Sequence, residues 1–200
     1  MKRYLLLGFF VLNTCSAFSQ KSSLNVGLTL LGVKDFSPFG GGIHFGYELA
    51  IPKVKFLAIE ARLGIGKLVG DGLYQRSPDK EWDYSAYYYM AGICPRGYYR
   101  LTCGLDLFLE TEVGIARMSG ETYFSDQKTW NPTKTVDTSY YSTRIGAVVP
   151  LTDKLKLSIA FGYSSLDITN MMNSKLSIIN YRFNDQVANF HTSATFHIIL

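Results

Sequence analysis

His191 and Ser193 are the residues whose types and spacing come closest to a catalytic pair in this chain of 200 residues. Two residues apart on a β-strand, they would share one face, and the imidazole could then accept the proton of the hydroxyl. No acidic residue is identifiable from the sequence as the partner that would orient the imidazole. We therefore interpret the two as polar residues on one strand face, and the sequence predicts no catalytic residue.

The other candidate sites are weaker still. His44, His191 and His197 fall at one strand parity, but the strands of His44 and His191 are expected to lie about 10 Å apart, with no cysteine or carboxylate at ligand spacing. Glu110 and Glu112 resemble a catalytic carboxylate pair, although a charged strand face explains them better. The glycines are spread along strands instead of forming a phosphate-binding loop. The sequence predicts no metal and no cofactor.

Residues 85–120 indicate which elements carry these side chains. Two long stretches with a period of two are joined at 102–104, a turn too short for a helix. In the second stretch one face reads Leu105, Leu107, Leu109, Thr111, Val113 and Ile115, and the other reads Asp106, Phe108, Glu110, Glu112, Gly114 and Ala116. At about 3.3 Å per residue, a strand of about 11 residues reaches roughly 36 Å, enough to cross a bilayer core of about 30 Å when tilted.

The same alternation recurs along the chain and predicts eight strands. They are 23–33, 42–51, 56–69, the two arms of 85–120, 138–149, 154–166 and 187–200. Long connections at 34–41, 70–84, 121–136 and 168–186 alternate with short ones at 52–55, 102–104 and 151–153. This asymmetry is typical of an all-β, eight-stranded antiparallel up-and-down transmembrane β-barrel. The long connections would then be extracellular loops, and both mature termini would be periplasmic.

The composition of the two strand faces decides which one points outward. A soluble lipocalin-like barrel would turn its apolar face inward and its polar face to water. Here the polar face has few charges and many glycines, which suit a crowded lumen. We therefore expect the bulky face to contact lipid, including Ile43, Leu63, Val113, Ile145 and Ile159. Aromatic girdles at the two interfaces are expected from Phe45, Tyr47, Tyr87, Tyr89, Tyr99, Tyr140 and Tyr141.

The N-terminal residues 1–19 have the pattern of a secretory signal peptide. A basic start is followed by an apolar run over 4–12 and a small-residue cleavage site at 17–19. The mature chain, 20–200, is then a single barrel domain. Removing the two basic residues of the signal from the 20 Lys and Arg leaves 18 against 16 Asp and Glu, a net charge of +2. That balance does not indicate a nucleic-acid partner.

Two cysteines remain in the mature chain, Cys94 and Cys103. Nine residues of strand place them roughly 30 Å apart, whereas the Cα atoms of a disulfide lie about 4.4–6.8 Å apart. We therefore expect free or packed thiols.

Charged residues at the inward parity predict an ion network in the lumen. With Cys103 at the centre of the hairpin, Arg96 faces Glu110 and Arg100 faces Asp106. Unpaired charges in a narrow barrel are costly, so opposite charges should pair across it. The predicted lumen network comprises Arg96, Arg100, Asp106, Glu110, Glu112, Glu60, Arg62 and Arg144, with Glu48 and Lys156 pointing into the same space. Side chains can just fill a barrel of eight strands, so we expect no continuous water channel.

The stretch 92–114 carries Arg-Gly-Tyr-Tyr, a short turn, and Leu-Phe-Leu before two glutamates. With the strand pattern of the whole mature chain, it resembles the eight-stranded outer-membrane β-barrel superfamily of Gram-negative bacteria, the class of the outer membrane protein A transmembrane domain. The resemblance implies the cell outer membrane, contact with outer-membrane lipid and lipopolysaccharide, the barrel-assembly machinery as a partner, and a monomer. One departure is the terminal Leu200, because such chains usually end in an aromatic residue.

Three functions follow from this reading. The leading one is a non-enzymatic barrel with a filled lumen, which anchors in the envelope and presents extracellular loops for interaction or adhesion. The second is a lipid-modifying enzyme using His191 and Ser193, since a lipid A deacylase of the same barrel size carries a similar pair. That enzyme works on its lipid-facing wall, whereas parity here turns both residues inward. The third is a small channel.

Overall fold

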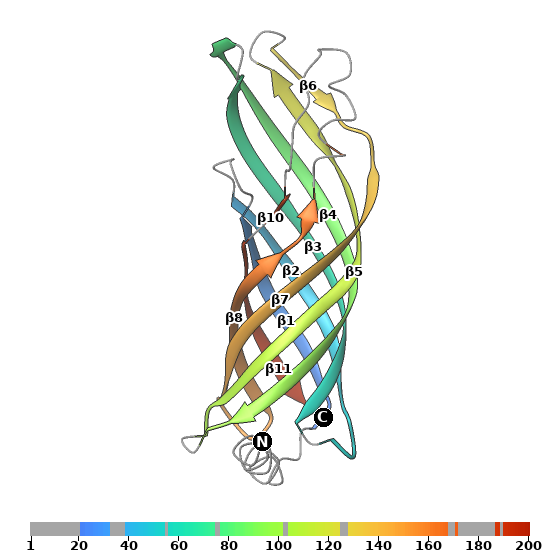
Figure 1. Cartoon of the computed structure of the whole chain (residues 1–200), viewed down its shortest axis with the longest axis vertical. Helices are drawn as coiled ribbons and strands as arrows, with labels where there is room; N and C mark the ends of the chain where they lie inside the picture. The colour runs from blue at the N-terminus through green and yellow to red at the C-terminus, as the bar shows by residue number, and fades with distance from the viewer. Residues whose placement is uncertain are drawn as a thin grey trace, which may run out of the picture.

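Eight antiparallel strands close a barrel in the part of the chain that the structure describes (Figure 1). The structure is a computed structural model and describes residues 21–32, 39–54, 56–74, 77–101, 104–124, 128–167, 171, 187–188 and 190–200. The barrel strands are β1 (Ser23–Gly32), β2 (Phe39–Ala50), β3 (Leu57–Tyr74), β4 (Ser77–Arg100), β5 (Asp106–Phe124), β7 (Val136–Pro150), β8 (Leu155–Ser164) and β11 (Phe190–Ile199). Three short strands are β6 (Thr129–Pro132), β9 (Leu166–Asp167) and β10 (Val187–Ala188).

Each barrel strand pairs with its neighbour in the chain, and β1 pairs with β11 to close the barrel. The predicted all-β up-and-down topology is therefore confirmed. The hairpin register places Arg96 opposite Glu110, Tyr98 opposite Phe108 and Arg100 opposite Asp106. Among the described residues, no helix is long and apolar enough to cross a membrane.

The barrel is apolar on the outside and polar on much of the inside. On β1, exposed Leu24, Val26 and Leu28 alternate with buried Asn25 and Thr29. The five residues predicted to face outward do so, with exposed fractions of 43% for Ile43, 63% for Leu63, 54% for Val113, 52% for Ile145 and 56% for Ile159. A soluble lipocalin-like barrel, which buries its apolar face, is contradicted by this distribution.

The strands β3, β4 and β5 extend well beyond the others (Figure 1). The prediction of loops at 70–84 and 121–136 was wrong over most of their length. β3 and β4 stay paired to Tyr74 and Ser77, and β5 continues to Phe124 and pairs with β6. These segments are polar because they extend beyond the apolar belt. The backbone hydrogen bonds between the strands nevertheless continue there. In the predicted loop 34–41, β2 already begins at Phe39. Most of the predicted loop 168–186 lies outside the described residues.

Short turns and the C-terminus lie together at the opposite end of the barrel from β6 (Figure 1). Gly104 has φ +82°, which L side chains rarely adopt, so glycine suits this turn. Its N–H donates to the Leu101 carbonyl at 3.2 Å, and Leu101 N–H donates to Leu105 at 2.8 Å. Leu200 N–H donates to the Ser22 carbonyl at 3.0 Å, which ties the last residue to the start of the described chain.

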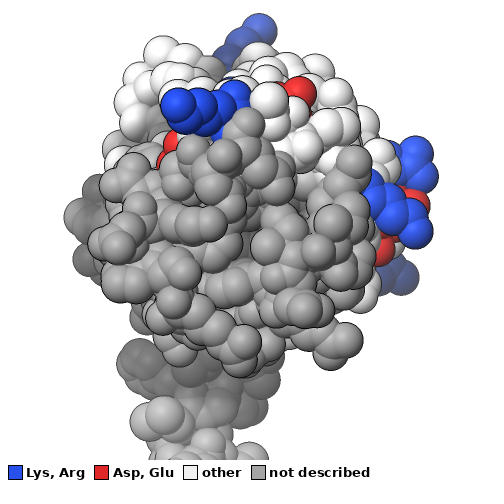
Figure 2. Space-filling view, turned by 90° about the horizontal axis from the view of Figure 1, so that it is seen from above, with Lys and Arg blue, Asp and Glu red and all other residues white. Residues whose placement is uncertain are grey.

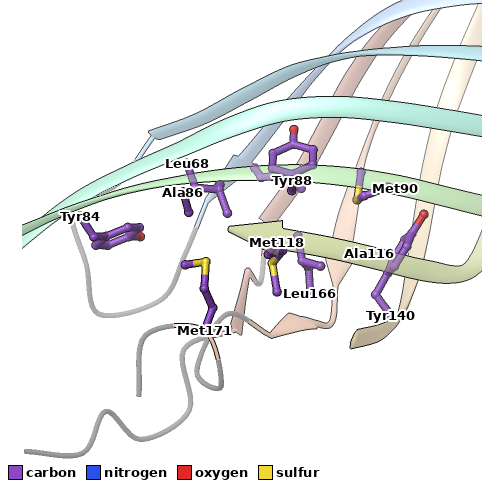
Figure 3. Packing of buried hydrophobic residues seen from close by; sticks show 11 residues of the cluster. Leu68, Tyr84, Ala86, Tyr88, Met90, Ala116, Met118, Tyr140, Leu166 and Met171 are labelled. Carbon is purple, nitrogen blue, oxygen red and sulfur yellow. The ribbon is translucent and has the colours of Figure 1, made fainter. Parts of the chain in front are cut away.

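The lumen is filled in three layers along the axis. Nearest the β6 end is a cluster of buried apolar side chains, shown in Figure 3: Leu31, Leu68, Tyr84, Ala86, Tyr88, Met90, Ala116, Met118, Tyr140, Leu166 and Met171. A second, smaller apolar cluster near the short turns comprises Ala58, Tyr98, Phe108, Val148 and Ala160. Between them lies a layer of buried charges, described next.

Candidate functional site: the charged layer of the lumen

The charged layer is built from alternate residues of five neighbouring strands. β2 contributes Glu48, β3 contributes Glu60 and Arg62, β4 contributes Arg96, β5 contributes Glu110 and Glu112, and β7 contributes Arg144. Alternate residues of a strand point to the same face, so each pair on one strand enters the lumen together. All seven side chains are at most 5% exposed.

Arg96 is the centre of the layer and contacts three carboxylates. Its Nε donates to Glu110 at 2.7 Å, and its Nη2 donates to Glu110 at 2.5 Å and to Glu60 at 2.9 Å. Its Nη1 donates to Glu48 at 2.5 Å. The guanidinium carbon also lies 4.9 Å from the ring centroid of Phe108, within the range of a cation–π contact. Arg96 therefore joins the charged layer to the lower apolar cluster.

Arg62 and Arg144 extend the layer towards the β6 end. Arg62 donates to Glu60 and to Glu112, both at 2.8 Å, and to Glu110 at 3.4 Å. Arg144 donates to Glu112 at 2.6 Å, and its Nε forms an ion pair with Glu110 at 2.7 Å without the angle of a hydrogen bond. Glu110 therefore contacts all three guanidinium groups. Removing it would leave all three short of a counter-charge.

Neutral donors complete the coordination of the carboxylates. The Tyr98 hydroxyl donates to Glu48 at 2.9 and 3.0 Å, the Tyr140 hydroxyl to Glu112 at 2.5 Å, and the Asn25 amide to Glu60 at 2.8 Å. Four carboxylates thus meet three guanidinium groups among the described residues of the layer. With every group ionised, the layer carries one surplus negative charge. Glu48 is the carboxylate with a single guanidinium partner, Arg96.

His191 is held by the charged layer and not by Ser193. Arg144 Nη1 lies 2.7 Å from His191 Nε2, and because a guanidinium only donates, Nε2 accepts. The ring proton is then on Nδ1 and is donated to the Ser142 hydroxyl at 2.9 Å. Both ring nitrogens are therefore occupied, and the structure does not assemble His191 and Ser193 into a nucleophile and its base. The two side chains are buried, 2% and 5% exposed.

Two other histidines form neutral contacts with hydroxyl groups of β1, β8 and β11. His44 lies between Thr29 Oγ1 at 2.9 Å and Thr195 Oγ1 at 3.0 Å, and His197 Nε2 lies 2.8 Å from Ser158 Oγ. Over the described residues, no group of three or more histidine, cysteine or acidic side chains is placed to hold a metal ion.

Six of the eight residues in the predicted network lie together in the charged layer: Arg96, Glu110, Glu112, Glu60, Arg62 and Arg144. Arg100 and Asp106 do not join them. They pair with each other at 3.0 Å, but the Arg100 side chain is 48% exposed at the end of β4. Asp106 is buried as predicted, at 4% exposed, but parity gives the face of a strand and not the depth along the axis, so the sequence pattern placed Arg100 too far inside.

Sequence reasoning also misplaced or missed several members of the layer. Tyr140 was predicted in an outer girdle but is 5% exposed and contacts Glu112 inside the barrel. The parity of Ser142 and Arg144 on the same strand would have placed it correctly. The other predicted girdle residues are exposed by 40–54%. Cys94, a buried free thiol as predicted, donates to Glu110 at 3.4 Å, while Cys103 lies outside the described residues.

Inward glycines make room for the large side chains of the lumen. A Cβ at Gly46 would overlap the Glu60 carboxyl group, and a Cβ at Gly66 would overlap the Tyr88 ring. The glycine-rich face seen in the sequence therefore reflects space taken by neighbouring side chains.

On the outer wall, Arg117 and Asp137 form an exposed pair. Arg117 Nε and Nη2 donate to the two carboxylate oxygens of Asp137 at 2.8 and 2.9 Å. This hydrogen bonding lowers the pKa of Asp137 and raises that of Arg117. Seen from the β6 end, the visible charged side chains of the described residues lie along the upper and right-hand sides, with cations and carboxylates adjacent on the right (Figure 2).

The comparison with known proteins supports the fold. No family model and no curated protein matches the sequence. Among solved structures, a major outer membrane protein from Thermus thermophilus is similar with a TM-score of 0.52 at 13% identity, over 90% of this chain and 100% of that one. Neisserial surface protein A gives 0.49 at 11% identity over 90% and 97%, and the N-terminal β-barrel domain of Pseudomonas aeruginosa OprF gives 0.46 at 10% over 90% and 98%. The likeness to the Thermus thermophilus protein shows that this chain shares the fold of that outer membrane protein.

Proposed function

We propose that this protein is a non-enzymatic outer-membrane barrel with a plugged lumen, which presents the tall rim formed by β3–β6 outside the cell. The observation that carries the proposal is the inverted distribution of side chains. Large apolar residues on all eight barrel strands are exposed, while buried residues include four glutamates and three arginines. A soluble protein would lose the free energy of hiding that apolar surface from water, whereas a bilayer accepts it.

The height of the apolar belt agrees with a bilayer. On β5 the outward residues are apolar or small from Leu107 to Ile115, and the next outward residue is Arg117. Eight steps of about 3.4 Å give roughly 27 Å along the strand, and a tilt of about 40° reduces this to roughly 21 Å. Transmembrane barrels carry an apolar band about 25 Å tall. The charged outward residues begin where such a band would end.

The filled lumen favours a plug over a channel. An open pore would leave the charged groups hydrated, but the charged layer is buried and bonded to itself from five strands. The apolar clusters above and below would both have to move for water to pass. We therefore favour no continuous water channel, and steady large conductance of the pure folded protein in planar bilayers would contradict this.

The partners follow from the location. The outward belt would contact outer-membrane lipid and lipopolysaccharide, the barrel-assembly machinery would insert the chain, and the tall rim would meet any extracellular ligand. Both termini of the mature chain would be periplasmic, with the short turns. The signal peptide over 1–19 lies outside the described residues and stays a prediction.

The test of the proposal is heat-modifiable gel mobility of the protein in isolated outer membranes. A folded barrel resists detergent at room temperature and migrates differently from its boiled form, whereas a soluble or unfolded chain shows one position. Proteolysis of intact cells checks orientation, since cuts are expected in the tall rim. Cuts confined to the turns at 52–55 and 151–153 would invert the topology. The enzymatic alternative predicts that cells with the gene contain chemically altered lipid A. Unaltered lipid A in cells that express the protein with His191 and Ser193 intact would count against this alternative.

A further inference from the structure

A hollow of about 540 Å³ lies on the outer face of the tall rim. Ser85 on β4 lies at its centre, and the sheet register places Val69 of β3 and Glu121 of β5 on either side of it. Along β4, Tyr87 lines the hollow on the side of the apolar belt, and Asp83 lines it on the side away from the belt. The hollow forms because the short side chain of Ser85 stands among longer ones.

Two aromatic side chains line the hollow, Tyr87 and Trp130, and each is 49% exposed. Trp130 is on β6, which pairs with β5, and the Thr133 N–H extends this pairing by donating to the Gly120 carbonyl at 2.7 Å. The Tyr123 ring packs against the indole, with the ring centroids 5.5 Å apart. The indole is therefore held beside the hollow and keeps exposed surface for a ligand. Tryptophan and tyrosine are enriched at protein interfaces for this kind of contact.

The hollow also presents two carboxylates, those of Asp83 and Glu121. Glu121 is directly opposite Ser85, two residues from Asp83, so the two acids are diagonal neighbours on one face of the sheet. Such neighbours lie about 7–8 Å apart. Within the described part of the chain, neither carboxylate forms an ion pair or a hydrogen bond. Like charges at this spacing repel each other, so a cation between them would be stabilised by both.

Lys67 is the cation that lines the hollow, and it lies at the belt end. It is directly opposite Tyr87 in the register, and its ammonium is 5.2 Å from the centroid of the Tyr87 ring. Asp83 is four residues farther along β4, about 14 Å at about 3.4 Å per residue. Lys67 and the two carboxylates together give the lining a net charge of −1, so the hollow is complementary to a positively charged ligand.

We infer that this hollow binds the side chain of an arginine from an extracellular protein. The guanidinium donates to Asp83 and Glu121 through separate N–H groups, and its planar face stacks on the indole of Trp130. A lysine ammonium would gain the charge contact without the planar stack. Because both aromatic walls are half exposed, the side chain enters without rearrangement of the rim. The inference rests on the proposed function and deepens it, since it requires the rim to lie outside the cell.

The test compares three capped tripeptides, in which glycine flanks arginine, lysine or citrulline. Citrulline has nearly the shape of arginine but carries no charge. The readout is the fluorescence of Trp130 in the folded full chain in zwitterionic micelles, with Trp82→Phe removing the other of the two tryptophans. We expect the arginine peptide to bind about tenfold more tightly than the citrulline peptide and about threefold more tightly than the lysine peptide.

Three variants locate the site. The double variant Asp83→Asn with Glu121→Gln removes both negative charges and should weaken binding of the arginine peptide about tenfold. Lys67→Gln should tighten binding about twofold, because it removes the repelling cation at the belt end of the hollow. Lys154→Gln is the matched control. It removes an exposed cation at the opposite end of the barrel and should leave binding unchanged.

The inference is overturned if the citrulline or the lysine peptide binds as tightly as the arginine peptide, or if the double variant binds like Lys154→Gln. Should Trp82→Phe fail to fold, saturation-transfer NMR of the peptide protons with the unaltered chain gives the same comparison. Heat-modifiable mobility of the same samples tests the proposed function separately, since a folded barrel without a preference for arginine refutes this inference alone.

Discussion

The tall wall and the short wall of the barrel bury different kinds of polar side chain in the lumen. The tall wall comprises β3, β4 and β5, with 18, 24 and 19 residues, and the short wall comprises β1, β8 and β11, with 10 each. The tall wall supplies five of the seven charged side chains of the layer. The buried polar side chains of the short wall are amides, hydroxyls and imidazoles, such as Asn25, Ser158 and His197.

The tall wall holds most of the contacts whose loss would cost the most free energy. Charge-assisted hydrogen bonds are about twice as strong as neutral ones, and breaking one partner of a buried pair leaves an uncompensated charge. The tall wall therefore depends on a complete set of charges. Its strands also leave the apolar belt, so the ion layer and the apolar cluster above it anchor a rim that projects into water. The short wall ends near the belt, and its own buried polar side chains are neutral, although Asn25 and His191 contact the charged layer.

The largest effect is expected from Glu110→Ala in the tall wall. Its removal leaves Arg62, Arg96 and Arg144 short of a counter-charge, and breaking a buried ion pair costs about 3–5 kcal/mol. The measurement is the free energy of unfolding in urea of the barrel in lipid vesicles. Thr195→Val on the short wall, which removes one hydroxyl contact to His44, should cost about 1 kcal/mol. Equal losses for the two variants would refute the comparison.

Val113→Arg should have the next largest effect, because it tests the outer face of the tall wall. Arginine at the midplane of a transmembrane barrel costs about 2–4 kcal/mol and falls to about 0–1 kcal/mol near the interface. Ser119→Arg is the matched control, since Ser119 lies on the same strand and face but above the belt. Folding yield into vesicles and urea unfolding report both variants. If Val113→Arg folds as well as Ser119→Arg, the belt does not lie in lipid.

The two walls also differ in how much of them the sequence could predict. Period-two alternation shows whether a side chain points into or out of the barrel without knowledge of its partners. The outward direction of Ile43 and Leu63 and the inward direction of His191 could therefore be predicted. The hairpin register at 102–104 followed from local symmetry, which put Arg96 opposite Glu110. Contacts across the lumen, such as Arg62 with Glu112 or Arg144 with His191, depend on strand tilt and shear. Those quantities are properties of the closed barrel and are absent from any one strand.

The tall rim was the main error, and its cause is physical. Asp71-Gly72 and Ser77-Pro78 are turn-like in composition, and no apolar face marks 70–84 as strand. The structure pairs Gly70 with Tyr84 and Gly72 with Trp82, so the ladder begun in the belt simply continues. The upper apolar cluster was missed for a different reason. Leu68, Met90 and Met118 have inward parity, but the charged and glycine-rich pattern of the inward face suggested a mainly polar lumen.

A smaller effect is expected from Glu48→Gln, which tests the surplus negative charge. Arg96 and the Tyr98 hydroxyl both donate to one oxygen of Glu48, and the single carbonyl oxygen of glutamine can accept from both. The variant brings the layer to equal numbers of carboxylates and guanidinium groups, so the loss of stability should stay below about 1.5 kcal/mol. Glu110→Gln, the same change at the carboxylate with three guanidinium partners, should cost clearly more in the same urea titration. The reverse order would mean that the layer does not carry the surplus at Glu48.

The smallest effect on folding is expected at the exposed pair formed by Arg117 on β5 and Asp137 on β7. Both side chains are more than 60% exposed, so solvent screens the pair and Arg117→Gln should leave the unfolding free energy nearly unchanged. The pair has a titration signature instead. Because the hydrogen bonds from Arg117 lower the pKa of Asp137, the small stabilisation is present above the ordinary aspartate pKa and is lost as pH falls through the lowered value. Carbon-13 NMR of the Asp137 carboxyl should show this low pKa, and Arg117→Gln should return it towards the ordinary value of 3.8. An unchanged pKa would show that the Arg117–Asp137 pair does not form in the bilayer.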